Sequence, residues 1–276
     1  MTALRTLVSG LAMGESPRWH DGRLWFSDMG TKVVTAVDLD GRAEVVAEVP
    51  GMPMGLGWLP DGTMLIVSSD GRLLRREPGG SLATQADLTG LSRYPWSDMV
   101  VDGRGNAYIG NIGFDFGARD EQPAGGAHPG TVALVTPDGT ARIVADDTAF
   151  PNGIAVTPDN ATLILAESYA NRLTAFDIDA SGALSNRRLW ADLGDGVPDG
   201  IWLDPQQAVW YADVPNQRCV RVREGGEVLQ TVEADRGCFA CVLGGPGDRT
   251  LFVMAARWPD CMDGDLRTGQ VLAIDV

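Results

Sequence analysis

Three polar side chains of this chain occupy the same place in a repeated sequence unit. Glu15, Asn152 and Asp199 each begin such a unit, although they are far apart in the chain. Taken singly, Asn and Asp at the end of a strand commonly bond the local backbone. Three oxygen donors at one repeat position instead form a ligand set that suits a hard divalent cation. Such a set favours a site of this kind over a zinc site built from thiolates. We therefore predict one metal site formed by these residues, with Ca²⁺ expected and Zn²⁺, Mn²⁺ or Mg²⁺ as alternatives.

The repeat itself consists of two short apolar runs joined by a turn rich in Gly, Pro, Asp or Asn. Six such units are present, and their starts are separated by about 45 residues on average. A period of this length, with further strand-like runs between the units, is typical of four-stranded propeller blades. The first positions of the six units are Glu15, Met54, Ser97, Asn152, Asp199 and Phe239.

This pattern predicts an all-β fold, a six-bladed β-propeller with four antiparallel strands per blade. The last unit has only 270–276 left for its third strand, so its fourth strand must come from 4–8 near the N-terminus, which closes the ring. A sandwich or a seven-bladed ring matches six units less well. Because the innermost strand of each blade lines the channel, the six first positions should form a ring at one mouth. Like charges gathered there raise each other's pKa unless a cation lies between them.

The whole chain, 1–276, is expected to be a single domain. Residues 110–130 form one long stretch without strand patterning. Loops of that length are usually lids or binding loops, and a solvated surface excursion is the alternative.

Composition narrows the partners and the compartment. The chain has 22 Lys and Arg against 37 Asp and Glu, a net charge of −15, which argues against a nucleic-acid partner. No apolar run approaches the length of a membrane span, and the first 13 residues lack the apolar core of a signal peptide. We expect a cytoplasmic protein with no membrane partner, either a monomer or a weak homo-oligomer.

The pair Cys238 and Cys241 lies inside an apolar run. Alternation along a strand would place the two thiols on opposite faces, which disfavours a redox pair. Buried structural thiols are the prediction.

Several motifs, taken together, are familiar. The chain resembles the SMP-30/gluconolactonase/LRE-like family in the segments Gly14-Glu15-Ser16-Pro17, Leu24-Trp25-Phe26-Ser27-Asp28, Phe150-Pro151-Asn152-Gly153, Leu184-Ser185-Asn186-Arg187-Arg188 and Pro198-Asp199-Gly200-Ile201. The resemblance implies a six-bladed propeller with one catalytic divalent metal on its axis, held by Glu15, Asn152 and Asp199. This ligand set agrees with the ring deduced from the repeat.

The third unit departs from that family's pattern. Many members carry Arg-x-Asn-Asp there, and the Asn and Arg contact the lactone; in this chain Ser97 replaces the Asn and Pro95 stands where the Arg would be. The resemblance therefore implies a modified set of substrate contacts, which comprises Arg93, Trp96, Ser97, Asp98, Asn111 and a lid carboxylate, Asp115. An aromatic rim of Tyr94, Trp96, Phe114 and Phe116 favours a less polar lactone or ester over glucono-lactone.

These observations predict a divalent-metal-dependent lactonase acting on a small-molecule lactone or ester. The ion would polarise the carbonyl oxygen while a water attacks, with Asp199 as the general base. Two alternatives stay open: a phosphotriesterase-like metal hydrolase on the same fold, and a non-catalytic calcium-binding propeller.

Overall fold

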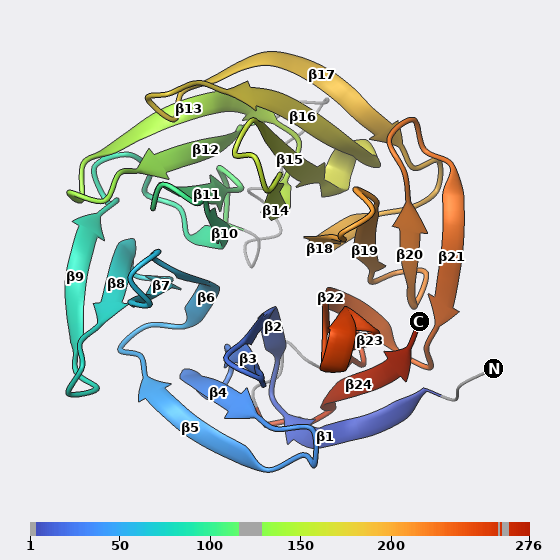
Figure 1. Ribbon diagram of the computed structural model, residues 1–276. Coiled ribbons are helices and arrows are strands. Elements are labelled where there is room, and N and C mark those ends of the chain that lie inside the picture. The colour runs from blue at the N-terminus through green and yellow to red at the C-terminus, as the bar shows by residue number, and fades with distance from the viewer. Residues whose placement is uncertain (1–3, 116–128, 259, 261–264) are drawn as a thin grey trace.

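The computed structural model describes residues 4–115, 129–258, 260 and 265–276. Over these residues the chain forms six four-stranded sheets, and every pair of neighbouring strands within a sheet is antiparallel. Figure 1 shows the sheets arranged around one axis. The predicted six-bladed β-propeller is confirmed. No helix in the described ranges is long and apolar enough to cross a membrane.

In blades 1 to 5 the four strands follow one another in the chain from the axis outward (Figure 1). Blade 1 contains β2 (Gly14–His20), β3 (Arg23–Asp28), β4 (Val33–Val37) and β5 (Ala43–Glu48). Blade 2 contains β6 (Pro53–Trp58), β7 (Met64–Ser68), β8 (Arg72–Arg76) and β9 (Leu82–Asp87). Blade 3 contains β10 (Trp96–Val101), β11 (Ala107–Asn111), β12 (Gly130–Val135) and β13 (Ala141–Thr148). Blade 4 contains β14 (Pro151–Val156), β15 (Thr162–Glu167), β16 (Arg172–Ile178) and β17 (Leu184–Asp192). Blade 5 contains β18 (Pro198–Leu203), β19 (Val209–Asp213), β20 (Arg218–Val222) and β21 (Val228–Glu233).

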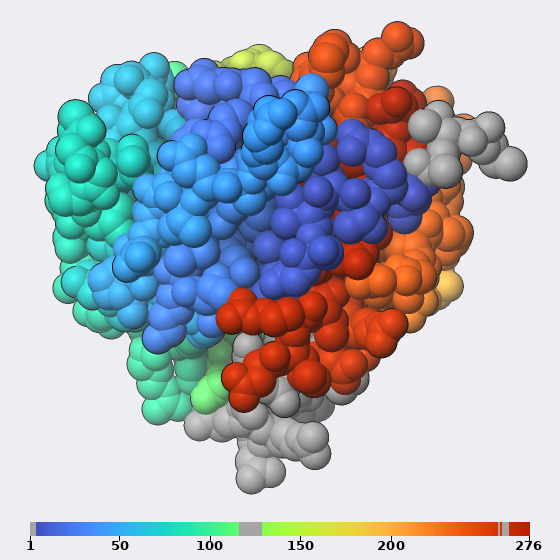
Figure 2. Space-filling view, turned by 90° about the horizontal axis from the view of Figure 1, so that it is seen from below, coloured from blue at the N-terminus to red at the C-terminus, as the bar shows by residue number. Residues whose placement is uncertain are grey.

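Blade 6 joins the two ends of the chain. Its order from the axis is β22 (Gly237–Gly244), β23 (Thr250–Ala256), β24 (Gly269–Asp275) and then β1 (Arg5–Leu11). Figure 2 shows the first, dark blue part of the chain beside the red C-terminal part. The N-terminal strand therefore supplies the fourth strand as predicted, and it extends three residues beyond the expected end at Val8. Pairing of β1 with β24 covers an edge that would otherwise be open.

The core lies between the blades. Six buried hydrophobic clusters fill the interfaces, one between each pair of neighbouring blades. The second strands β7, β11 and β19 are buried along their whole length because blades cover both of their faces, whereas an outer strand such as β5 is mostly exposed. The blades are therefore packed against each other sideways, and the first strands present their mouth-end residues to the axis.

Cys238 and Cys241 are buried, as predicted, but their arrangement differs from the expectation, and Cys261 lies outside the described residues. Cys219, Cys238 and Cys241 are free thiols in one cluster between blades 5 and 6. The prediction of opposite faces for Cys238 and Cys241 is wrong, because the β22 ladder shifts between Cys238 and Ala240, and the extra residue restores a common face. Burial raises the pKa of the Cys219 thiol, which makes it a poor nucleophile.

Candidate metal and active site

The predicted ligands lie at the start of the first strands of blades 1, 4 and 5. Glu15 is in β2, Asn152 in β14 and Asp199 in β18. In each of these strands the ladder register shifts close to the residue in question; in β14 the shift falls between Pro151 and Ile154 and leaves Asn152 out of the regular pairing. A bulge of this kind frees a side chain from the ladder and re-aims it, and bulges are common next to active sites.

Glycines directly after two of these residues let the first strands approach each other. A Cβ atom on Gly153 would lie 2.4 Å from the backbone nitrogen of Ile201 in blade 5. A Cβ atom on Gly200 would lie 2.4 Å from the Cβ of Ala240 in blade 6. Only glycine fits such spacing. The Asn-Gly and Asp-Gly pairs thus bring the mouth-end side chains of neighbouring blades together.

The carboxyl groups at this mouth are electrostatically strained. Burial raises the pKa of Glu15 to about 8. A hydrogen bond from the backbone N–H of Ser16 opposes this rise, repulsion from Asp98 adds to it, and the attraction of Arg18 opposes it. Burial also raises the pKa of Asp199, and repulsion from Glu15 and Asp98 raises it further, while a hydrogen bond from Asn152 lowers it. Carboxyl groups from blades 1, 3 and 5 therefore interact at one point of the ring, and their negative charge is not balanced there.

The guanidinium group of Arg18 lies beside these carboxyl groups and forms an ion pair with Asp98. Its Nη2 atom donates to Asp98 Oδ1 at 2.8 Å and to the carbonyl oxygen of Met99 at 2.6 Å. Ser16 Oγ donates to the same Asp98 oxygen at 2.7 Å. Three carboxylates and one guanidinium carry two negative charges in excess when all are ionised. This excess is the charge that one divalent cation would balance.

The donor set fits such a cation. Asn152 Nδ2 donates to Ser168 Oγ at 3.3 Å, and Ser168 Oγ donates to the carbonyl oxygen of Pro198 at 2.7 Å, so the amide is oriented with its oxygen as the remaining ligand atom. Among the residues that the structure describes, no three His, Cys, Asp or Glu side chains gather into a metal site. A site on the ring therefore needs the Asn152 oxygen beside Glu15 and Asp199, a hard oxygen set that suits Ca²⁺ or Mg²⁺.

Of the predicted substrate contacts, Asp98 is part of this cluster and Ser97 precedes it in β10. Ser97 Oγ donates to the carbonyl oxygens of Gly110 at 3.1 Å and Pro151 at 3.3 Å. Asp98 is held by Arg18 as described above. Both polar groups thus serve contacts within the protein.

Trp96 and Asn111 are built into blade 3. Trp96 is fully buried in the cluster between blades 2 and 3, and its indole Nε1 has no hydrogen-bond partner within the described ranges. Asn111 is also buried, and its Nδ2 atom donates to the carbonyl oxygens of Tyr94 and Pro95 at 2.9 and 3.0 Å. Its Oδ1 atom accepts from the backbone N–H of Gly113 at 2.9 Å. Neither polar group is directed to the ring.

The place of Asn111 in the repeat explains its role. It ends the second strand of its blade, and the residues that end the second strands of blades 1, 4 and 5 are Asp28, Glu167 and Asp213. Asp28 accepts from the backbone N–H groups of Ala12 and Met13, on the segment that leads into the next strand. Asn111, Asp28 and Glu167 each bond the segment that leads into the first strand of their blade, whereas Asp213 accepts from Asn216 and Arg218. Their common repeat position was the signal that could have shown this role.

The remaining predicted contacts lie outside the cluster. Arg93 is exposed, and its guanidinium carbon lies 4.7 Å from the ring centroid of Tyr94. Asp115 is exposed at the end of a described range. Phe116 and most of the expected lid loop, residues 116–128, lie outside the described residues.

An aromatic cluster at the same mouth was only partly foreseen. Phe114 lies 5.8 Å from Phe150 and 6.0 Å from Tyr169, and the rings of Phe150 and Tyr169 are 4.8 Å apart, all between centroids. Tyr169 follows Ser168, the residue that contacts Asn152. Its position just after the end of a second strand, like Phe114 after β11, was the available signal.

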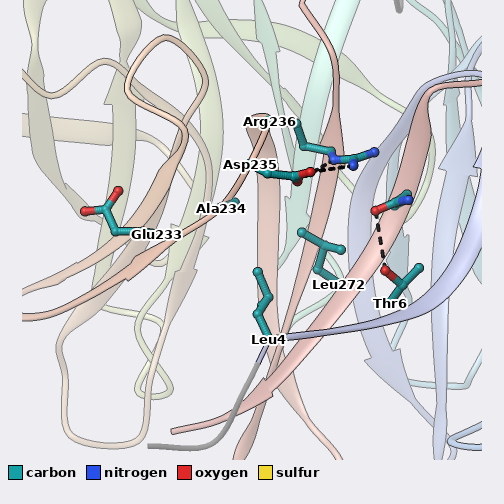
Figure 3. A pocket seen from close by; sticks show the side chains of 8 residues that line it. Leu4, Thr6, Glu233, Ala234, Asp235, Arg236 and Leu272 are labelled. Carbon is teal, nitrogen blue, oxygen red and sulfur yellow. Dashed lines mark hydrogen bonds and ion pairs between the residues drawn. The ribbon is translucent and has the colours of Figure 1, made fainter.

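Two cavities lie away from the ring. One, of about 410 Å³, lies at the seam of blades 5 and 6 beside Leu4, Asp235 and Arg236, where Figure 3 shows the Asp235–Arg236 ion pair. The other, of about 240 Å³, lies on the axis behind the ring and is lined mainly by apolar side chains of the first strands, with Arg18 among them. The ring is distinguished by its unbalanced charge.

Comparison with known proteins identifies relatives of this chain and of its fold. The sequence model of the SMP-30/Gluconolactonase/LRE-like region matches residues 13–257. Regucalcin of Xenopus laevis is 27% identical over 94% of this chain and 87% of its own length, and a gluconolactonase of Zymomonas mobilis is 22% identical over 93% and 80%. A solved structure titled as a calcium-binding protein, regucalcin, from Agrobacterium tumefaciens superposes with a TM-score of 0.81 at 22% identity, over 99% of this chain and 95% of that one.

Proposed function

This chain belongs to the SMP-30/Gluconolactonase/LRE-like family, and from that premise we propose that it is a divalent-metal-dependent lactonase. The observation that carries the proposal is the cluster of Glu15, Asp98 and Asp199 at one mouth of the propeller, where desolvation and repulsion from neighbouring carboxylates raise the pKa of Glu15 and of Asp199. Groups with strongly shifted pKa values that converge from separate elements are a physical mark of a functional site.

Glu15, Asn152 and Asp199 would hold the cation. When bound, a divalent cation supplies Lewis-acid polarisation of the lactone carbonyl and favours the ionised carboxylates. Asp199 would accept a proton from the attacking water and return it to the alkoxide that leaves as the ring opens. Asn152, oriented by Ser168, would keep its oxygen directed at the same point. Arg18 would keep Asp98 paired and away from the cation.

The names of the relatives support two further choices. A gluconolactonase among the relatives supports a lactone as the substrate class. A regucalcin structure described as calcium-binding supports Ca²⁺ as the ion, and the oxygen-only donor set is consistent with it. We propose a cyclic ester as substrate and Ca²⁺ as the preferred cation.

The substitution Asp199→Asn tests the proposal. It preserves size but removes the base and a charged ligand, so kcat/KM for lactone hydrolysis should fall by about 10³-fold or more. Rates would be measured on a panel of lactones and one phosphotriester, after chelation and after adding back Ca²⁺, Mg²⁺, Mn²⁺ or Zn²⁺. Asp195→Asn is the matched control, because Asp195 is 81% exposed in the segment before the same strand.

Two results would contradict the proposal. One is a folded Asp199→Asn protein that hydrolyses lactones at the wild-type rate. The other is a wild-type protein that binds no divalent cation and opens no lactone under any of these conditions.

A further inference from the structure

The connections between second and third strands all lie at the mouth where the ring lies. Each second strand runs antiparallel to its first strand, so its end is beside the start of the first strand. Phe114 follows β11 in blade 3, Tyr169 follows β15 in blade 4 and Trp258 follows β23 in blade 6. Aromatic side chains from three blades are thus carried to the side of the propeller that holds Glu15, Asn152 and Asp199.

Tyr169 is the exposed member of the cluster in blades 3 and 4. It is 47% exposed, whereas Phe114 is buried beneath it and Phe150 is partly buried. Phe150 has φ of 59°, which is rare for a bulky residue, and its carbonyl oxygen accepts from the backbone N–H of Ser168 at 3.1 Å. The tyrosine ring is therefore supported from below and is tied through Ser168 to Asn152.

A second aromatic pair comes from blade 6. Trp258 is 47% exposed, and its ring centroid lies 6.2 Å from that of Phe239, the sixth residue in the predicted ring. Phe239 itself is buried against Ala256, Met13 and Val214. Large apolar surface is thus exposed in two places at this mouth.

Two of the predicted sugar contacts, Ser97 and Asn111, are meanwhile engaged within the protein. Ser97 Oγ donates to two backbone carbonyl oxygens, and both Asn111 Nδ2 bonds go to backbone carbonyl oxygens. The Trp96 indole is buried. A polyhydroxylated lactone that left its hydroxyl groups without partners would lose the hydrogen bonds it makes in water.

We propose that Tyr169 is a specificity-determining residue that selects lactones carrying an aryl or alkyl substituent over polyhydroxylated sugar lactones, with Trp258 as a second apolar contact. The inference rests on the proposed lactonase function and names its substrate class. The reacting ester would lie at Glu15, Asn152 and Asp199, and the substituent would pack on the exposed face of Tyr169. Aromatic surface of this kind binds apolar groups by excluding water from both.

The test compares three lactones on four proteins. Dihydrocoumarin carries an aryl group, δ-decalactone an alkyl chain, and glucono-1,5-lactone only hydroxyl groups. The proteins are wild type, Tyr169→Ser, Tyr169→Phe, and Leu189→Ser as a control for loss of an exposed apolar side chain on β17, the outer strand of blade 4.

In the wild type we expect kcat/KM for the aryl and alkyl lactones to exceed that for glucono-1,5-lactone by about tenfold or more. Tyr169→Ser should lower the two apolar values about 10- to 100-fold, mostly through KM, and leave the sugar lactone unchanged. Tyr169→Phe and Leu189→Ser should behave as wild type. A preference for the sugar lactone, an equal loss on all three substrates, or a loss in Tyr169→Phe would overturn the proposal.

A binding experiment separates this inference from the proposed reaction. The lactam counterpart of dihydrocoumarin, 3,4-dihydro-2(1H)-quinolinone, cannot be opened as an ester, and its affinity can be measured by calorimetry. It should bind Tyr169→Ser about tenfold more weakly than wild type. Equal affinity for both proteins overturns the apolar contact whether or not any lactone is hydrolysed, whereas binding without any hydrolysis overturns only the lactonase function.

Discussion

Two carboxyl groups of this propeller, one fully buried and one partly buried, differ in what surrounds them. Glu167, at the end of β15, is fully buried, yet its pKa is lowered: burial alone would raise it, but hydrogen bonds from Arg172, Thr174 and the backbone N–H of Ala149 outweigh that effect. Arg187 Nη2 also lies 3.1 Å from Glu167 Oε1. Glu15, at the start of β2, has its pKa raised to about 8, because desolvation outweighs its one backbone hydrogen bond, from Ser16, and the attraction of Arg18, while Asp98 adds to the rise.

The difference shows which buried charges serve the fold and which are kept for a ligand. A carboxylate with two arginines and a backbone donor is satisfied by the protein itself. Carboxylates that repel each other at the axis have a cost that the protein alone does not offset, and a bound cation would offset it. Substitutions at the two places should therefore change the free energy of unfolding in opposite directions.

The largest effect is expected at the satisfied carboxylate. Glu167→Ala leaves Arg172 and Arg187 without their partner and frees the segment held through Ala149, so the free energy of unfolding should fall by about 3 kcal/mol. Urea denaturation measures it. Glu227→Ala is the control, because Glu227 is 64% exposed in a surface ion pair with Arg223 and should change stability by less than about 1 kcal/mol. If the two substitutions lowered the free energy of unfolding equally, Glu167 would stabilise the fold no more than an exposed ion pair does.

The second-largest effect is expected at Glu15 and has the opposite sign, because a substitution there should raise the free energy of unfolding. Because the pKa of Glu15 is about 8 in the folded protein and near 4.5 when unfolded, the folded state binds this proton more tightly. The cation-free wild type should therefore lose stability as the pH rises from about 4.5 to 8. Glu15→Gln should remove the part of that loss that Glu15 causes, leaving the part due to Asp199, and should be about 2 kcal/mol more stable than wild type at pH 8 in chelator.

Urea denaturation at pH 5 and pH 8, with chelator and with Ca²⁺, would measure this effect. The difference between the two proteins should vanish at pH 5, and Ca²⁺ should stabilise only the wild type at pH 8. Glu44→Gln, at an exposed side chain in β5, is the control. A Glu15→Gln protein that is less stable than wild type in chelator at pH 8 would show that this carboxylate is satisfied like Glu167.

The smallest effect is expected at Ser168, which connects the satisfied carboxylate Glu167 with the predicted ligand Asn152. Ser168 lies directly after Glu167 and orients Asn152, so Ser168→Ala should cost about 1 kcal/mol of stability and weaken Ca²⁺ binding roughly tenfold. Calorimetric titration gives the affinity, and Ser185→Ala on exposed β17 is the control. Unchanged Ca²⁺ affinity in Ser168→Ala would mean that the orientation of Asn152 does not depend on this bond.

Much of the architecture could be predicted from the spacing of apolar runs. The turn between the first two strands recurs six times, so the number of blades and the closing role of the N-terminal strand followed from counting. Boundaries were less certain: the closing strand extends to Leu11, because pairing with β24 continues past Val8 through two irregularities. Local patterning cannot show where a ladder continues on a distant partner.

The side chains around the site were harder to predict. Asn111 and Trp96 have residue types suited to recognising a substrate, but the packing of blade 3 buries both. Arg18 showed no repeat signal, and its importance depends on Asp98, a residue of blade 3 that reaches it across the axis. The alternation rule failed at Cys238 and Cys241 for a similar reason, since a bulge in β22 depends on how that strand is paired.

The sequence by itself determined the blades and the residues at the mouth of the channel, because periodicity is a local property of the chain. The tertiary structure decided which polar residues find partners. Glu15 and Glu167 are the same amino acid, each near the end of a strand at this mouth, and only the packing of blades distant in the chain distinguishes them. One lies beside like charges and the other beside arginines, and desolvation makes that difference large.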